Sequence, residues 1–140
     1  MIFMDTSVLV CASTPSDPRH ETCVDLLWTA ETRGGICASH SLAELFSMLT
    51  GRPRPLRVAP VEAARIVAHT SKRFRFVSLT AAEYVAAVDG LAGLGHSGGM
   101  IYDALIVACA RKAKASRIYT LNPRHFRLVA PDLSSRIVEP

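Results

Sequence analysis

The chain of 140 residues is long enough for one domain with its own hydrophobic core, since 49% of its residues are apolar and 20% are charged. This balance excludes a disordered protein. The four cysteines form no Cys-x-x-Cys pair, which argues against a zinc site and favours buried thiols in a reducing compartment. No apolar run reaches transmembrane length, so we expect a single cytoplasmic domain, residues 1–140, without membrane association.

The formal net charge of +4 favours a polyanionic partner. Seven of the sixteen cationic residues lie between Arg52 and Arg75, against one acid, Glu62. Thirteen of the sixteen are arginines, whose planar guanidinium suits phosphate groups. The segment therefore indicates a phosphate-binding surface, with a solvated basic face as the alternative.

The first half of the chain alternates short apolar runs with helical spacing. An apolar run over residues 2–4 predicts a buried strand that ends at Asp5. A helix is expected from Asp17-Pro18 to the Gly34-Gly35 stop, followed by a strand over 36–38. Ser39 or Ser41 begins a further helix that ends near Thr50-Gly51, with Glu44 on the side away from its apolar stripe. Three prolines make residues 52–59 a loop.

The second half continues the alternation. Helical spacing over 61–70 precedes a strand expected over 74–79. Thr80 is expected to be the N-cap of the next helix, with Glu83 completing a capping box, and this helix is expected to fray at Gly90, Gly93 and Gly95. The run over 100–110 is apolar nearly all round, which predicts a buried helix with Asp103 buried in it. Such a carboxylate is expected to be neutralised, paired with a cation or bound to a metal; the alternative is an acid stabilised by the helix N-terminus after the Gly98-Gly99 turn. Two more strands are expected over 117–121 and 136–138.

This order of elements predicts a three-layer α/β/α domain with a mainly parallel central sheet. Because ligands collect at the carboxyl ends of parallel strands, we expect Asp5 and Asn122 there, joined by Glu44 and Asp103 if their helices begin at the same edge. Three crowded carboxylates repel, so a divalent cation is the natural partner, and oxygen ligands favour Mg²⁺ or Mn²⁺. Such a metal can activate water for attack on a phosphodiester.

Several other side chains have weaker signals. Thr6 and Ser7 carry hydroxyls suited to capping a turn or orienting a carboxylate, and Ser7 and Thr120 are the candidates for supporting the site, although such groups more often bond to the backbone. His125 is expected to position its loop, and the other four histidines show no partner spacing. The three tyrosines and Trp28 show no periodic platform for stacking on single-stranded RNA.

Four motifs in order carry a family resemblance: DTS at 5–7, LAE at 42–44, YDALIVA at 102–108 and TLNPRHF at 120–126. Together they resemble the PIN-domain ribonucleases, most closely the VapC toxins of bacterial type II toxin–antitoxin systems. The resemblance implies a PIN-like fold and a Mg²⁺- or Mn²⁺-dependent endoribonuclease that acts as a toxin. It implies that Asp5, Glu44 and Asp103 are the acidic metal-binding and catalytic residues. The fourth position is often Asp in the family but is Asn122 here, which adds no charge.

The resemblance also implies partners. Family members are typically neutralised by a small antitoxin encoded alongside, and they commonly form homodimers. With RNA as the substrate, Arg52, Arg54 and Arg57 are the candidates for contact with its backbone.

Two other classes of function compete with this reading. A phosphatase of the haloacid dehalogenase type also begins with an Asp after the first strand, but Ser7 stands where its second Asp is required. A non-catalytic RNA- or partner-binding module with an incomplete metal site has Asn122 as its only support. Such a module would hold RNA equally well in the presence of a chelator.

Overall fold

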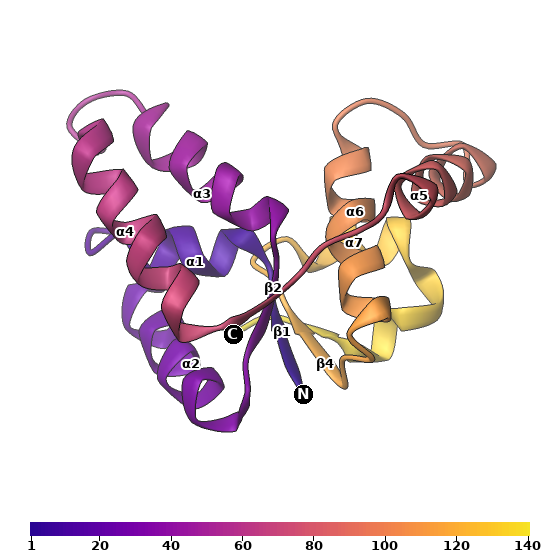
Figure 1. Cartoon of the computed structure of the whole chain (residues 1–140), viewed down its shortest axis with the longest axis horizontal. Coiled ribbons are helices and arrows are strands. Elements are labelled where there is room, and N and C mark those ends of the chain that lie inside the picture. The colour runs from indigo at the N-terminus through magenta and orange to yellow at the C-terminus, as the bar shows by residue number, and fades with distance from the viewer.

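Five short strands form one parallel sheet in this computed structural model, which describes residues 1–140. The strand order is β3-β2-β1-β4-β5, and every neighbouring pair is parallel. Helices cover both faces of the sheet (Figure 1). The expected three-layer α/β/α architecture is therefore confirmed. The strands are β1 (Ile2–Met4), β2 (Ile36–Ala38), β3 (Arg75–Val77), β4 (Arg117–Tyr119) and β5 (Ile137–Val138).

The helices divide between the two sides of the sheet in chain order. Figure 1 shows α1, α2, α3 and α4 on the left and α5, α6 and α7 on the right. The first group is α1 (Thr6–Ala12), α2 (His20–Arg33), α3 (His40–Thr50) and α4 (Pro60–Arg73). The second group is α5 (Ala81–Gly93), α6 (Met100–Lys112), α7 (Pro123–Val129) and the 3₁₀-helix η1 (Pro131–Arg136).

Each face of the sheet has its own hydrophobic core. Neighbouring strand residues point to opposite faces, so Phe3 packs with Ile106, Ile118 and Phe126 beneath α6 and α7. Met4 belongs to the other core, with residues of α1, α2 and α3 that include Leu9, Leu27 and Leu45. Strand β1 is thus buried on both sides, which fixes the position of the residue that follows it.

Local signals explain most helix ends. The helix α2 ends at Gly34 in the left-handed conformation, with φ of 78°, and a Cβ on Gly35 would lie 2.8 Å from the Cβ of Ala30. The capping box between Thr80 and Glu83 is confirmed at the start of α5. The four cysteines are free and buried, as expected.

The structure corrects four expectations. Helices α1 and α7 were not predicted, because each has only 7 residues and too few turns to show a periodic pattern. The helix α2 begins at His20, since Asp17 accepts from the Arg19 amide in a turn. The helix α5 continues through Gly90 without fraying and ends at Gly93, the second of the three glycines named for its end.

The fourth correction concerns α6, which is not buried all round. Its fully buried side chains begin at Leu105, whereas Met100 and Ile101 in the first turn pack against the core but are only partly buried. Tyr102 is therefore 51% exposed, and the Asp103 side chain keeps 28% of its surface exposed. No helix of the protein combines the length and apolar character needed to cross a membrane.

Candidate active site at the carboxyl edge of the sheet

The candidate site lies where the connections leave β1 in opposite directions. The chain runs from β1 to β2 on one side, whereas β4 and β5 lie on the other side. Such a switch point opens a crevice at the carboxyl ends of the strands. Asp5 directly follows β1, Thr120 directly follows β4, and α3 with Glu44 begins soon after β2. The first turn of α6 brings Asp103 to the same place.

Asp5 is held by three hydrogen-bond donors. It is the N-cap of α1, and its Oδ1 accepts from the Thr6 amide at 2.7 Å. Its Oδ2 accepts from the Ser7 hydroxyl at 2.6 Å and the Thr120 hydroxyl at 2.9 Å. The side chain is nearly buried, and this burial raises the pKa of the carboxyl group, while the hydrogen bonds act in the opposite direction.

Backbone amides fix the orientation of those two hydroxyls. The Leu121 amide donates to Ser7 Oγ and the Asn122 amide donates to Thr120 Oγ1, each at 3.0 Å. Since each hydroxyl oxygen accepts from an amide, its own proton is free to point at Asp5. The loop after β4 therefore positions the carboxylate at the end of β1.

Glu44 is linked to Asp5 through Thr6. The Thr6 hydroxyl donates to Glu44 Oε2 at 2.6 Å, and Thr6 Oγ1 lies 2.8 Å from the buried Ser41 Oγ. The Glu44 side chain is 27% exposed and lies away from the apolar stripe of α3, at the crevice. The Thr6 hydroxyl was expected to be able to orient a carboxylate, but nothing in the sequence indicated that this carboxylate is Glu44.

Asp103 completes the group of carboxylates. Burial, together with the charges of Asp5 and Glu44, raises the pKa of the Asp103 carboxyl group to about 6. His125 opposes this shift, with Nδ1 4.0 Å from Asp103 Oδ2. The three acids are therefore close enough for their charges to interact.

Asn122 borders the same group from the loop after β4. It is the N-cap of α7, but its side chain makes no capping hydrogen bond and is exposed. Its backbone amide donates to the Thr120 hydroxyl, which in turn donates to Asp5 Oδ2. The Asn122 amide side chain is thus free to meet a ligand.

No partner spacing was noted for His40 in the sequence, yet two side chains lie beside its ring in the structure. His40 Nε2 lies 3.7 Å from Glu44 Oε1, at the i,i+4 spacing of α3. Its ring also stacks on Tyr102, with centroids 5.6 Å apart and planes 4° apart. The helical spacing to Glu44 was visible in the sequence, whereas the stack joins two helices and has no periodic signal.

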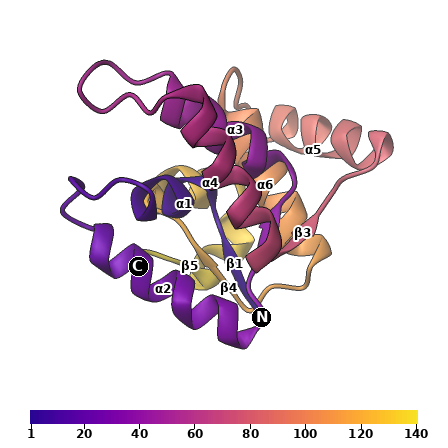
Figure 2. The same cartoon turned by 60° about the vertical axis from the view of Figure 1, so that its left-hand side comes forward.

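The three candidate arginines differ in their contacts. The half-buried Arg52 donates to Thr14 Oγ1 at 2.8 Å, and Arg57 Nε donates to the Arg52 carbonyl at 2.8 Å. These bonds hold the loop between α3 and α4, which projects from the body in Figure 2. Arg54 is exposed and makes no hydrogen bond or ion pair, so its guanidinium is available to a phosphate.

Part of the basic segment is neutralised within the protein. Arg65 pairs with Glu62, and Arg73 pairs with Glu31 while lying over the ring of Trp28. Five cations of the segment have no acidic partner: three lie in the projecting loop, and the other two are Lys72 and Arg75.

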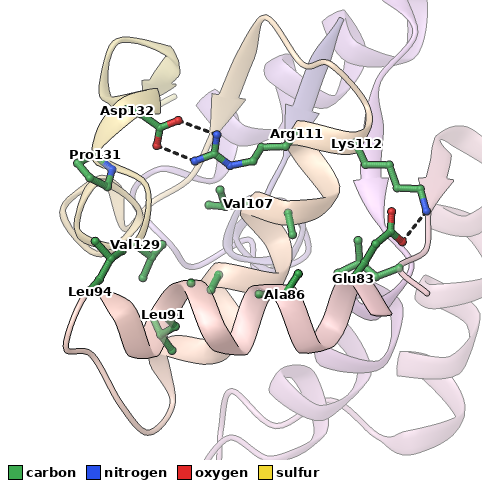
Figure 3. A pocket seen from close by; sticks show the side chains of 15 residues that line it. Glu83, Ala86, Leu91, Leu94, Val107, Arg111, Lys112, Val129, Pro131 and Asp132 are labelled. Atoms are coloured by element: carbon green, nitrogen blue, oxygen red, sulfur yellow. Dashed lines mark hydrogen bonds and ion pairs between the residues drawn. The ribbon is translucent and has the colours of Figure 1, made fainter. Parts of the chain in front are cut away.

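A cavity away from the grouped carboxylates is a separate feature. It has a volume of about 670 Å³ and lies between α5, α6 and the segment of α7 and η1 (Figure 3). Ion pairs flank it, with Arg111 bound to Asp132 and Lys112 bound to Glu83. None of the grouped carboxylates lines this cavity, so it is not part of the candidate active site.

The donor chemistry of the grouped acids fits a hard divalent cation. Asp5, Glu44 and Asp103 offer only oxygen atoms, as Mg²⁺ and Mn²⁺ prefer. Burial, and after it the charges of Asp5 and Glu44, make ionisation of Asp103 costly, and a bound cation would offset that cost. No three His, Cys, Asp or Glu side chains already form a complete ligand set, so these side chains would have to draw together around the ion.

Comparisons with known proteins show which family the chain is similar to. The family model of the PIN domain matches residues 2–130. Ribonuclease VapC27 of Mycobacterium tuberculosis is 34% identical over 80% of this chain and 78% of its own length. Ribonuclease VapC40 of the same species is 36% identical over 82% of each chain.

Two solved structures share the fold. The first is M. tuberculosis VapC20, described as a toxin that cleaves the sarcin–ricin loop, with a TM-score of 0.71, 24% identity and coverage of 89% of this chain and 92% of that one. The second is VapBC2 from Rickettsia felis bound to a DNA fragment from its promoter, with a TM-score of 0.69, 20% identity and coverage of 99% and 98%.

Proposed function

Since the chain belongs to the PIN-domain family and, within it, to the VapC ribonucleases, we propose that it is an RNA-cleaving toxin whose endonuclease activity depends on Mg²⁺ or Mn²⁺. One observation carries the metal dependence. Asp5, Glu44 and Asp103 come from three distant parts of the sequence and meet at the carboxyl edge of the sheet, where burial and the charges of Asp5 and Glu44 make ionisation of Asp103 costly. A cation between them offsets this cost.

The chain's own residues supply position and charge. Ser7, Thr120 and the Thr6 amide fix both oxygens of Asp5, and the Thr6 hydroxyl fixes one oxygen of Glu44. The cation, when bound, lowers the pKa of water and offsets the charge that develops on the phosphate. Asp103, from the opposite side of the sheet, confines the reacting phosphate to the crevice.

Cleavage of total cellular RNA tests this proposal. Purified protein is incubated with RNA in Mg²⁺ or in chelator, and the new 5′ ends are mapped. We expect discrete cuts that require the metal. A protein that binds RNA equally in both buffers without cutting it would instead be the non-catalytic binding module.

The toxin role predicts growth arrest. Expression of the wild-type chain alone should stop growth of a bacterial host, because the cell's own RNA is the substrate. Co-expression of the neighbouring small open reading frame should relieve the arrest through an antitoxin that co-purifies in a stable complex. An Asp103→Asn chain is the matched control and should be harmless. If the folded, active wild-type protein is harmless at high expression, the toxin role is wrong.

The arginines of the projecting loop are expected to bind the phosphate backbone of RNA. We expect Arg54→Gln with Arg57→Gln to weaken RNA binding for every sequence and to lower the salt slope by about 1.4, at roughly 0.7 per lost phosphate contact. The cut sites should not move. The control is Arg33→Gln with Arg117→Gln, two exposed cations at the amino edge of the sheet. Arg52 is left in place because it anchors the loop through Thr14. An unchanged salt slope would show that these arginines form a solvated basic face and do not contact RNA.

Replacing Asn122 with Asp is expected to raise the affinity for the metal ion. Asn122→Asp adds a carboxylate next to the three acids, at a side chain that makes no capping bond. We expect tighter Mn²⁺ binding by calorimetry and equal or higher activity at low Mg²⁺. Asn122→Ala removes the amide without adding charge and should not bind the ion more tightly. Weaker binding by the Asp variant would place this side chain outside the metal site.

A further inference from the structure

Two aromatic rings form a stack beside the grouped carboxylates. His40 is the first residue of α3 and Tyr102 lies in the first turn of α6, so the two helix starts meet through these rings. The centroids lie 5.6 Å apart and the planes differ by 4°. This near-parallel, offset arrangement is a favoured geometry for aromatic pairs.

Each ring lies next to a different acid of the site. His40 Nε2 lies 3.7 Å from Glu44 Oε1 and is closed to solvent without a hydrogen-bond partner. Tyr102 directly precedes Asp103. The stack therefore borders the crevice, with one ring adjoining Glu44 and the other next in the chain to Asp103.

The two rings differ in exposure, which assigns them different roles. His40 lies against Glu44 and covers one face of the tyrosine ring. Tyr102 keeps 51% of its surface exposed and makes no hydrogen bond through its hydroxyl. An exposed ring that is backed by a second ring is a rigid flat surface with one side open to a ligand.

We propose that Tyr102, backed by His40, stacks on a nucleobase of single-stranded RNA that flanks the scissile phosphodiester. This inference rests on the proposed ribonuclease function and names a contact that selects the substrate. A phosphate held near Asp103 brings a flanking base within reach of the adjacent Tyr102 ring. Aromatic stacking on a base is strong and tolerates several sequences, while larger bases gain more contact. His40 is a positioning residue, since it acts through Tyr102.

Direct binding in chelator tests the stack without requiring activity. The probe is a short, unstructured, fluorescein-labelled RNA of mixed sequence. We expect Tyr102→Ala to weaken binding by roughly 5- to 100-fold, the range for loss of one stacked base. Tyr102→Phe should retain affinity because the hydroxyl has no role. His40→Ala should weaken RNA binding less than Tyr102→Ala does, but more than Tyr102→Phe does. Tyr84→Ala, at an exposed tyrosine of α5, is the matched control.

A fluorescence variant reports the contact itself. The chain has one tryptophan, so Tyr102→Trp in a Trp28→Phe background places the only indole at the stack. We expect RNA to quench its emission, and we expect Trp28 in the wild-type chain to be unaffected. The loss of affinity in Tyr102→Ala should also persist at high salt, because stacking releases no counterions.

The outcomes separate this inference from the ribonuclease proposal. In Mg²⁺, Tyr102→Ala should change the bases preferred next to the cut, whereas Tyr84→Ala should leave the cut sites unchanged. Equal RNA affinity of wild type and Tyr102→Ala, or no quenching in the Tyr102→Trp variant, would overturn the stacking contact. Absence of any cleavage by the wild type would overturn the ribonuclease proposal while the binding assay still decides the stack.

Discussion

We expect Asp5→Asn and Asp103→Asn each to lower the rate of Mg²⁺-dependent RNA cleavage by more than about 100-fold, since groups that merely orient a metal ligand are worth 10- to 100-fold. Both changes remove a charge and preserve the volume of the side chain. In Asp5→Asn the amide oxygen still accepts from the Thr6 amide, and the Ser7 and Thr120 hydroxyls can rotate to accept from the new NH₂ group. The variants should therefore stay folded.

The control for charge removal is Asp25→Asn, at an exposed aspartate of α2 that contacts none of the site residues. It should cleave RNA at the wild-type rate. Single-turnover cleavage of a mapped substrate, with circular dichroism to confirm folding, gives the comparison. Wild-type rates in the Asp5 or Asp103 variant would contradict the metal-site proposal.

The layers of the fold were predictable because their signals are local. The apolar run of β1, the capping box at Thr80 and the stop at Gly34 each depend on a few neighbouring residues. The alternation of strands and helices then restricts the topology, since parallel connections have one preferred hand. The short helices α1 and α7 escaped prediction because seven residues do not display a helical period.

The candidate site was only partly predictable because its contacts join distant segments. The expected burial of Asp103 was too strong, and Asp5 is the more buried acid, since it follows a strand covered on both faces by hydrophobic cores. The Thr6 contact with Glu44 joins α1 to α3, and the His40 stack on Tyr102 joins α3 to α6. Single residues in the sequence gave no sign of either pair.

The metal-free protein should be more stable when Asp103 is replaced by Asn. The pKa of Asp103 is raised in the folded protein to about 6, above its ordinary value near 4. The unfolded chain thus ionises first, and stability is lost as pH rises from about 4 to about 6. Above pH 6 the folded protein carries the full cost of the charge, about 1 to 3 kcal/mol after allowance for solvent around a side chain that is 28% exposed.

Thermal melting in chelator checks this prediction. At pH 7.5 we expect Asp103→Asn to melt about 3 °C or more above the wild type, and at pH 4 we expect the difference to become small. Asp25→Asn should show no such dependence on pH. Excess Mg²⁺ at pH 7.5 should raise the melting temperature of the wild type and reduce the advantage of the variant, because the ion binds the folded state and offsets the same charge. A variant that is less stable than the wild type at pH 7.5 in chelator would show that Asp103 is stabilised by a partner rather than opposed by Asp5 and Glu44.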